Sequence, residues 1–340
     1  MVRTVGIPRA LVYYYYYPQW KTFFEDLGFK VVVSDKTSKR IVDLGVKITL
    51  NDACIPIKLV HGHILDLMEK KVDALFVPRL VSLDSDATLC PKFLGLPDMV
   101  RSKMDKLPVY IDERLDNRRR GYTEEKFYIQ VGNKLGKTKS ESLAAFRHSK
   151  QVFEDYRKLL TSGLNAFEAM EILDKGKNIE EAVKEQQKKN TLEISETGKL
   201  HFAVIGYVYL IYDDFVNANL LKKLDQLGAV PHLFDQLPEE GIAAQAEKMP
   251  RELFWMFSNR VVKGAFHYLS EDKIDGIIHV SAFGCGPDAM TTKLIEIQAK
   301  YHTTIPYMRI LVDEHTGEAG LMTRLESFTD MIRRKGVRKK

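Results

Sequence analysis

"RTVGIPRALVYYYYYPQWKTFFEDLGFKVVVSD", residues 3–35, decides the fold class of this chain. The stretch begins with a short apolar run, "RTVGI", and ends with another, "KVVVSD", each with the length and composition of a β-strand. Between them Trp20, Phe23 and Phe24 recur at helical spacing, and Gly28 suits the end of a helix. The stretch therefore predicts a strand, a helix and a second strand.

The same alternation recurs in two parts of the chain. "VDALFVPRLVS" and "LPVYIDE" are further strand candidates in the first part, and "KLHFAVIGYVYLI", "AVPHLFDQ", "KIDGIIHVSAFG" and "PYMRILVDEH" are candidates in the last. Between them the sequence is polar and has helical periodicity. Strands that alternate with helices are typical of parallel sheets covered on both faces. We predict an α/β fold: two parallel-sheet domains at 1–120 and 200–332, a helical insert at 121–199 and a basic tail at 333–340.

The two α/β parts also resemble each other. "VDALFVP", residues 72–78, matches "IDGIIHV", residues 274–280, in its pattern of apolar residues. Each is followed by a cysteine near a proline, and then by a strand that ends in Asp-Glu. Self-similarity of this kind is expected of a duplicated unit, so we interpret the chain as two similar domains.

Composition bounds the class of protein. The chain has 340 residues, of which 45% are hydrophobic and 29% charged, as in ordinary globular proteins. No apolar run reaches the roughly 18 residues that cross a bilayer, and the start has no signal-peptide pattern, so we predict a cytoplasmic protein without a membrane segment. The tail at 333–340 carries six positive side chains, more than the whole net charge of +5. We interpret it, with "NRRRG" at 117–121, as solvated surface rather than a nucleic-acid site.

Three cysteines share one local pattern. Cys54, Cys90 and Cys285 each stand one or two residues before a proline, and helical periodicity follows each of them. Proline is favoured in the first turn of a helix, so each cysteine is predicted at a helix N-terminus near the carboxyl edge of a sheet, where a thiolate is stabilised. Gly284 and Gly286 let the backbone approach whatever Cys285 binds. Three thiolates fit a [4Fe–4S] cluster with one iron free of protein thiolate, whereas three buried cysteines that only pack are the alternative.

Two further motifs leave alternatives open. His61 and His63 in "HGH" are metal-ligand candidates by residue type, but polar or packing roles explain them as well. Residues 284–289 fit G-x-G-x-x-A, the dinucleotide fingerprint, after a strand and before a helix. Pro287 removes an N–H where phosphate would bind, which weighs against a nucleotide there.

Taken together, these residues resemble a known family. "NDACIPIKLVHGHILDL", "DGIIHVSAFGCGPDAM" and "ILVDEHTGEAGLMTRLESFTDMI" are similar to the activase-related proteins akin to the D-component of 2-hydroxyacyl-CoA dehydratases, a superfamily that includes benzoyl-CoA reductases and double-cubane cluster proteins. The resemblance covers roughly two thirds of the chain. It implies two Rossmann- or flavodoxin-like domains around a [4Fe–4S] cluster, alone or in a larger bridged cluster, with Cys54, Cys90 and Cys285 as ligands.

The resemblance also implies partners and a role. A separate ATP-hydrolysing activator would deliver low-potential electrons, and a homologous subunit or a second copy of the chain would complete the assembly. The expected function is reduction of a small-molecule or acyl-CoA ligand at the open iron, in an oxygen-sensitive protein of an anaerobe. The alternatives are a non-catalytic electron relay or cluster scaffold, so whether the chain is an oxidoreductase, a dehydratase-like enzyme or neither stays open.

Four other residues complete the candidate site. His315 and Glu318, after the last strand, are candidate proton donors to a ligand, although a capping box at Thr323 that starts a helix explains the same stretch. Arg9 and Lys58 are candidates for holding an anionic group of a cofactor, or for pairing with a carboxylate.

Overall fold

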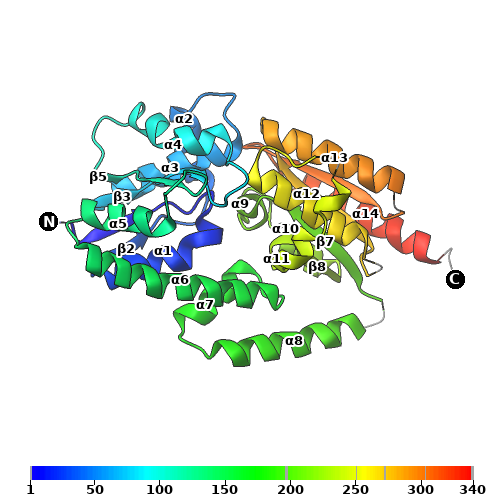
Figure 1. Cartoon of the computed structure of the whole chain (residues 1–340). Helices are drawn as coiled ribbons and strands as arrows, with labels where there is room; N and C mark the ends of the chain where they lie inside the picture. The colour runs from blue at the N-terminus through cyan, green and yellow to red at the C-terminus, as the bar shows by residue number, and fades with distance from the viewer. Residues whose placement is uncertain (1, 196–197, 250, 272, 303, 338–340) are drawn as a thin grey trace. The chain divides into compact units, whose positions relative to one another are not determined.

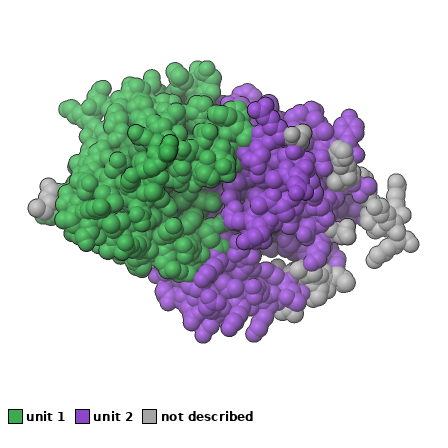
Figure 2. All heavy atoms as spheres, viewed as in Figure 1, with its two compact units in different colours: residues 1–157, 253–256 green, residues 158–252, 257–340 purple. Residues whose placement is uncertain are grey.

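The computed structural model describes residues 2–195, 198–249, 251–271, 273–302 and 304–337. The chain divides into two compact units, coloured separately in Figure 2: unit 1 comprises residues 1–157 and 253–256, and unit 2 comprises residues 158–252 and 257–340. The predicted insert at 121–199 is thus shared, with its first part in unit 1 and the remainder in unit 2.

Unit 1 is built on a four-stranded parallel sheet with the order β2-β1-β3-β5. Its strands are β1 (Thr4–Ile7), β2 (Lys30–Val33), β3 (Ala74–Phe76) and β5 (Val109–Ile111). A two-stranded parallel sheet adds β4 (Arg79–Ser82) and β6 (Arg114–Asp116). Its helices are α1 (Tyr13–Asp26), α2 (Lys39–Ile48), α3 (Ile55–Glu69), α4 (Pro91–Arg101), α5 (Glu124–Lys134) and most of α6 (Lys139–Thr161).

Aromatic rings fill the core of unit 1. Trp20 and Phe24 of α1 contact the Phe76 ring of β3 at centroid distances of 4.9 and 5.0 Å. Phe23, on the same helix, packs against Tyr128 of α5 at 4.7 Å. Burial of these large rings is the main source of stability for this packing. The helical spacing seen in the sequence therefore did identify the buried face of α1.

Unit 2 is built on a second parallel sheet, with the order β8-β7-β9-β10. Figure 1 labels β7 and β8 of this sheet. Its strands are β7 (Leu200–Gly206), β8 (Ala229–Leu233), β9 (Gly276–Ala282) and β10 (Tyr307–Val312). Its helices are α7 (Ala166–Asp174), α8 (Ile179–Ser195), α9 (Val208–Ile211), α10 (Leu220–Gln226), α11 (Glu239–Ala243), α12 (Met256–Leu269), α13 (Gly286–His302) and α14 (Glu318–Val337), with short 3-10 turns at Phe234–Gln236 and Ala246–Lys248.

The two sheets have the same strand order. In each unit the first strand in sequence lies between the second and the third, and the fourth strand lies outside the third. The predicted α/β class with two parallel sheets is therefore confirmed. The equal orders also agree with the sequence match between 72–78 and 274–280, which fall on the third strand of each sheet.

Two strand predictions were too long. "VDALFVPRLVS" is divided at Pro78 into β3 and β4, because proline has no N–H for the sheet. "KLHFAVIGYVYLI" ends as a strand at Gly206, whose φ of +146° favours glycine. A side chain at Gly206 would meet the Val280 carbonyl oxygen at 2.4 Å, so the chain leaves the sheet there and enters α9.

Helices α2 and α3 touch through their backbones. A methyl group added at Gly45 of α2 would lie 1.9 Å from the Lys58 carbonyl oxygen, and one added at Gly62 of α3 would lie 2.0 Å from that of Ile41. Only glycine permits so close an approach. This contact fixes the direction of α3 and hence the place of the loop before it.

Among the described residues, no helix combines the length and the apolar composition that a membrane span requires.

Candidate functional site

Cys54 and Cys90 occupy equivalent places at the starts of two helices of unit 1. Cys54 is the N-cap of α3 and Cys90 the N-cap of α4, and a proline lies in the first turn of both helices. Their backbone angles are nearly identical, with φ of −63° and −64° and ψ of 151° and 154°. The prediction that these cysteines stand at helix N-termini is confirmed.

Burial dominates the ionisation of the Cys54 thiol. It raises the pKa of Cys54, while the positive charges of Lys92 and Lys58 and the N–H of Ile57 oppose it. Lys58, a predicted anion-binding residue, is itself buried within α3. The surroundings thus combine a dry pocket with groups that favour the thiolate.

Burial also dominates the ionisation of the Cys90 thiol. Burial raises the pKa of the Cys90 thiol, the N–H groups of Phe93 and Lys92 lower it, and the charge of Cys54 raises it again. Two cysteines from separate parts of the sequence thus begin helices of the same unit.

Cys285 belongs to unit 2, where it lies between the end of β9 and the start of α13. Its N–H donates to the Ala282 carbonyl at 3.3 Å, and its carbonyl accepts from the Ala289 N–H at 3.0 Å. Gly284 has φ of +71°, and a side chain at Gly286 would meet nothing within 4 Å. Gly284 thus makes the turn between β9 and α13, and the space beside Gly286 is open.

The three cysteine thiols are the candidate ligands of an iron–sulfur cluster. Thiols at helix N-termini are the right ligands, because backbone N–H groups stabilise thiolates and cluster sulfurs alike. Cys54 and Cys90 provide two such thiols in unit 1, and Cys285 provides one in unit 2. Within the residues described, no three or more His, Cys, Asp or Glu side chains gather in a metal-binding group. The three thiols have the chemistry that cluster ligands need, and two of them begin helices of the same unit.

The histidines of "HGH" have other partners. His63 is fully buried, and its Nδ1 and Nε2 lie 2.9 and 3.1 Å from the hydroxyl oxygens of Ser34 and Thr37. His61 Nδ1 lies 2.8 Å from the Ile57 carbonyl oxygen, and burial lowers the pKa of its ring. Both ring nitrogens of His63 are engaged by hydroxyl groups, so His63 has a polar packing role and no nitrogen left for a metal ion.

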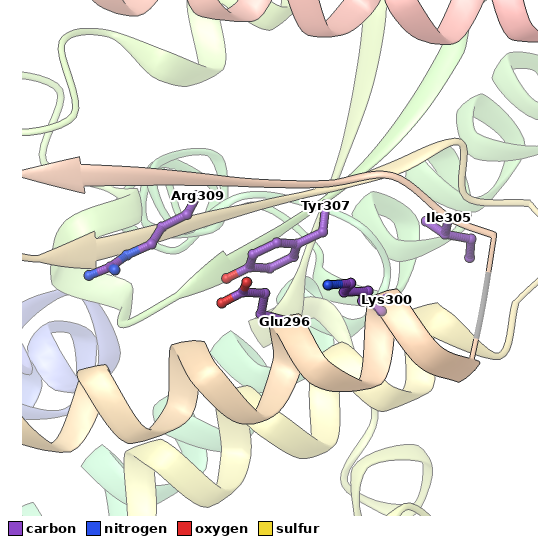
Figure 3. Close-up of a pocket in the computed structure, with 6 residues that line it drawn as sticks. Glu296, Lys300, Ile305, Tyr307 and Arg309 are labelled. Carbon is purple, nitrogen blue, oxygen red and sulfur yellow. The ribbon is translucent and has the colours of Figure 1, made fainter.

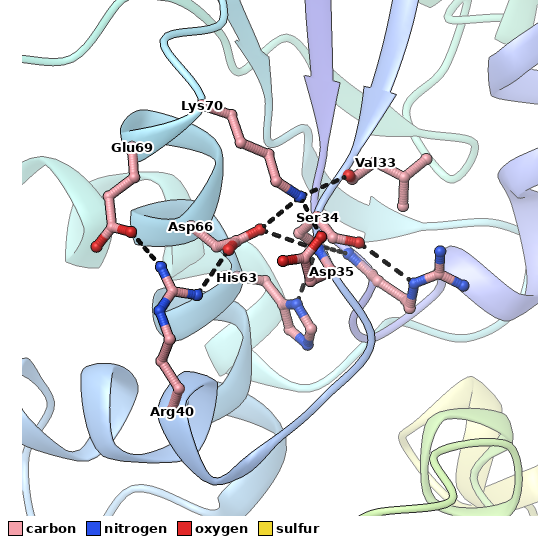
Figure 4. Close-up of polar contacts among 9 residues, drawn as sticks. Val33, Ser34, Asp35, Arg40, His63, Asp66, Glu69 and Lys70 are labelled. Carbon is pink, nitrogen blue, oxygen red and sulfur yellow. Dashed lines mark hydrogen bonds and ion pairs between the residues drawn. The ribbon is translucent and has the colours of Figure 1, made fainter.

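Asp66, next to His63 on α3, anchors the loop after β2 (Figure 4). Its carboxylate accepts hydrogen bonds from the Asp35 N–H at 2.9 Å and from Arg40 at 2.8 Å, and Lys70 lies 2.9 Å away. Burial alone would raise the pKa of Asp66, but these three partners outweigh it and the pKa is lowered. The network ties α2, α3 and the end of β2 together, and so holds the helix that Cys54 begins.

Arg9 also belongs to this region. Its N–H donates to the Ser34 hydroxyl at 2.8 Å, its Nε donates to the Ser34 carbonyl at 3.4 Å, and its guanidinium lies 5.1 Å from the centre of the Tyr13 ring. These contacts give Arg9 a bracing role between the ends of β1 and β2, in addition to the anion-binding role expected from the sequence.

His315 and Glu318 are exposed in unit 2. The His315 N–H donates to the Asp313 carboxylate at 2.9 Å, and Glu318 accepts from the Asn219 side chain at 2.8 Å. Helix α14 begins at Glu318, so the capping box expected at Thr323 is wrong: the Thr323 hydroxyl donates to the Ala319 carbonyl inside the helix. The helix starts earlier because Asp313 and Thr316 already form a closed turn before it.

The alternative nucleotide site at 284–289 contains a buried acid. Asp288, in the first turn of α13, accepts from the Ala282 N–H at 3.1 Å. A carboxylate at this place repels phosphate, and Pro287 withholds an N–H.

Sequence reasoning missed a cavity beside Cys54. It has a volume of about 420 Å³, and its wall includes Asp52 and Ala53, which precede Cys54, together with His61, Lys92 and Lys103. The remaining wall residues are Thr49, Leu50, Ile57, Met99 and Ser102. The stretch "CIPIKLVHGH" contributes Ile57 and His61 to the wall, but the cavity itself could not be predicted, because cavities arise from the packing of distant segments.

Comparison with known proteins adds one match. Residues 4–237, more than half of the chain, match the model of a protein family described as CoA enzyme activase uncharacterised domain. The matched range includes Cys54 and Cys90 and ends before Cys285. No curated protein matches the chain.

Proposed function

We propose, from the premise that this chain belongs to the family of CoA enzyme activase uncharacterised domains, that it is an iron–sulfur protein that supplies electrons for chemistry on a small molecule or acyl-CoA. Cys54, Cys90 and Cys285 are the proposed thiolate ligands of a [4Fe–4S] cluster. The resemblance to D-component-like proteins supports this finer reading, as does the ligand chemistry of the three loops.

One observation carries the proposal. Cys54 and Cys90 come from separate segments, yet they begin two helices of one unit with nearly the same backbone angles, and the N–H groups of each first turn favour its thiolate. A pair of thiols that only packed would need neither the helix N-termini nor the nearby positive charges. Both features favour a bound group that carries negative charge.

When bound, such a cluster supplies one-electron reduction at low potential. The chain's own residues prepare its place. Cys54 and Cys90 must release their protons to serve as ligands, and the N–H groups of Ile57 and Phe93 offset the resulting charge. Lys58 and Lys92 add positive charge, and burial of the Cys54 thiol keeps water away.

The cavity beside Cys54 favours reduction of a small molecule over a pure relay. Its wall is largely apolar, and Lys92 and Lys103 contribute two positive charges. A molecule with an apolar body and an anionic group fits this combination. We propose a separate ATP-hydrolysing activator as the electron donor and a CoA enzyme or a second, similar subunit as the partner, in an oxygen-free cytoplasm.

The test is the iron and acid-labile sulfide content of the anaerobically purified and reconstituted chain, with EPR of the reduced protein. We expect about four irons and four sulfides per chain, as one [4Fe–4S] cluster requires. Cys54→Ser, Cys90→Ser and Cys285→Ser should each lose the EPR signal or change it. Ala289→Ser, an exposed change in the first part of α13, is the control that adds a hydroxyl without removing a thiol.

The outcomes separate three cases. Loss of iron in all three cysteine variants supports the proposed ligand set. Loss in Cys54→Ser and Cys90→Ser alone confines the metal to unit 1 and removes Cys285 from the site. A chain that stays free of iron after reconstitution overturns the proposal.

A further inference from the structure

The face of the unit 2 sheet beneath α13 is unexpectedly polar. In the strand register Arg309 of β10 lies beside His279 of β9, and Tyr307 lies two residues before Arg309 on the same face. The opposite face carries apolar residues such as Ile278, Val280 and Ile310. It packs against α14, since a side chain at Gly276 would meet Phe328 and Ile332 there. Polar groups beneath a covering helix cost desolvation, which marks this face as a candidate site.

Three of the side chains form a chain of contacts. The Tyr307 hydroxyl lies 2.9 Å from His279 Nδ1, and His279 Nε2 lies 3.4 Å from Asp288 Oδ1. His279 and Asp288 are 0% and 1% exposed. His279 Nε2 and Asp288 Oδ1 have no hydrogen-bond partner in the part of the chain that the structure describes. A carboxylate buried this deeply calls for a positive charge beside it.

The outer end of this chain lines a cavity. Tyr307 and Arg309 project from β10 toward α13, and Glu296 and Lys300 project back from that helix (Figure 3). With Ala299 and Ile305 they enclose about 450 Å³. Arg309 is held in place by donation from its Nε to the Ser281 hydroxyl at 2.8 Å. Glu296, the one acid in this wall, has Lys293 at 3.3 Å, so positive charge prevails around the cavity.

We propose that this cavity binds a small anion, of the carboxylate or phosphate type, and that binding draws a proton onto the buried His279–Asp288 pair. This site is separate from the cysteines and does not depend on the proposed cluster. Arg309 and Lys300 attract the anion, and the Tyr307 hydroxyl is its hydrogen-bond partner.

The proton link follows from hydrogen-bond direction. The Asp288 carboxylate lies 3.4 Å from His279 Nε2, and a ring lone pair facing that negative charge would be repelled. A neutral His279 therefore carries its proton on Nε2 and accepts the Tyr307 hydroxyl proton on Nδ1. The cavity then faces lone pairs of the hydroxyl. When His279 gains a proton, Nδ1 becomes a donor to Tyr307, and the hydroxyl proton turns toward the anion. One proton is taken from solvent and no bond other than N–H is formed.

The surroundings of His279 agree with this switch. Its charged and titratable neighbours are Asp288 on α13 and Tyr307 and Arg309 on β10, while its partner on β7 is the apolar Ile205. Burial raises the pKa of Tyr307 above its usual value, with Arg309 opposing and Asp288 adding to the effect. Tyr307 therefore keeps its proton at neutral pH and acts as a neutral donor.

The test is isothermal titration calorimetry with sulfate and, separately, acetate, each in two buffers of different ionisation enthalpy. The two anions distinguish a tetrahedral from a planar site. We expect proton uptake with each anion bound, and an affinity that rises as the pH falls, by up to about tenfold per pH unit for one linked proton. Tyr307→Phe should bind about tenfold more weakly, as expected for loss of one hydrogen bond to a charged group.

Two further variants complete the design. His279→Gln should still bind the anion but lose the proton uptake and the pH dependence, which a purely structural residue would not do. Tyr301→Phe is the matched control: Tyr301 is exposed on α13 outside the cavity wall, and binding should not change. If His279→Gln does not fold, Tyr307→Phe still decides, because it removes only a hydroxyl.

Two results would overturn the proposal. The first is failure of both anions to bind the wild-type chain up to about 50 mM, weaker than any specific site needs. The second is binding that is independent of pH and unchanged in Tyr307→Phe.

Discussion

His63 is a buried imidazole whose two ring nitrogens are both engaged, by Ser34 and Thr37. Burial, reinforced by the positive charge of Arg9, lowers the pKa of His63 to about 3. In the unfolded chain a histidine titrates near its ordinary value of about 6.5. The unfolded state therefore binds more protons between these two values, and the stabilisation, complete above the unfolded pKa, is lost as the pH falls toward the folded one.

We predict that His63→Asn reduces the fall in the free energy of unfolding as the pH drops below about 6.5. In the wild type the pKa of about 3 implies a loss of up to about 3 kcal/mol between pH 6.5 and pH 4 from this residue. Urea denaturation at a series of pH values measures it. Ile64→Val, a buried change on the same helix that removes no titratable group, should keep the wild-type slope. An unaltered slope in His63→Asn would contradict the assignment.

At the scale of single residues, the sequence identified candidate residues but did not show which role each of them has in the fold. The histidines of "HGH" could have been metal ligands or packing residues. For His63 the partners Ser34 and Thr37 decide between these roles, and they come close to His63 only in the folded chain. The starts of α3 and α4 were predictable, since proline in a first turn acts locally. Asp288 and His279 were not identified, because nothing in the sequence shows that a helix will bury one against the other.

At the scale of elements, the crossing of α2 and α3 depends on two glycines. We predict that Gly62→Ala destabilises the fold by about 1–3 kcal/mol, because its methyl group would lie 2.0 Å from the Ile41 carbonyl oxygen. Gly95→Ala, within α4, meets nothing within 4 Å and should be neutral or stabilising by up to about 1 kcal/mol. Chemical denaturation of both variants compares them directly. Equal effects would mean that the helices separate without cost.

Elements with a clear period were predictable, and their ends were less so. Helix α1 and the strands β1 and β2 lie where the opening stretch indicated. The strand ends at Pro78 and Gly206 required knowledge of which neighbour each residue meets. The polar face of β9 and β10 was hidden, since alternation shows that a strand has two faces and not what covers each.

At the scale of the whole molecule, the two tryptophans report on one unit only. Trp20 and Trp255 both belong to unit 1. Because each unit has its own sheet and core, we predict that Leu325→Ala, a fully buried change on α14, lowers unit 2 stability by about 2–5 kcal/mol. The circular dichroism transition should shift or split while the tryptophan fluorescence transition stays in place.

The converse variant lies in unit 1. Leu67→Ala, also fully buried, should shift the fluorescence transition. If both signals move together in both variants, the units unfold as one and the prediction fails. The two-unit architecture itself followed from the repeated alternation in the sequence. The return of residues 253–256 to unit 1 could not be predicted, because it depends on contacts with residues that are distant in the sequence.

The return of residues 253–256 to unit 1 has a consequence for biosynthesis. Thr88, two residues before Cys90, donates its N–H to the Phe254 carbonyl and accepts from the Met256 N–H at 2.8 Å. A ribosome makes Cys90 long before it makes Phe254, so the nascent loop lacks the segment that it bonds with while the intervening residues are synthesised. The loop of Cys90 is thus completed only after Met256 has been synthesised, and any group that needs the loop in its final form binds after that point.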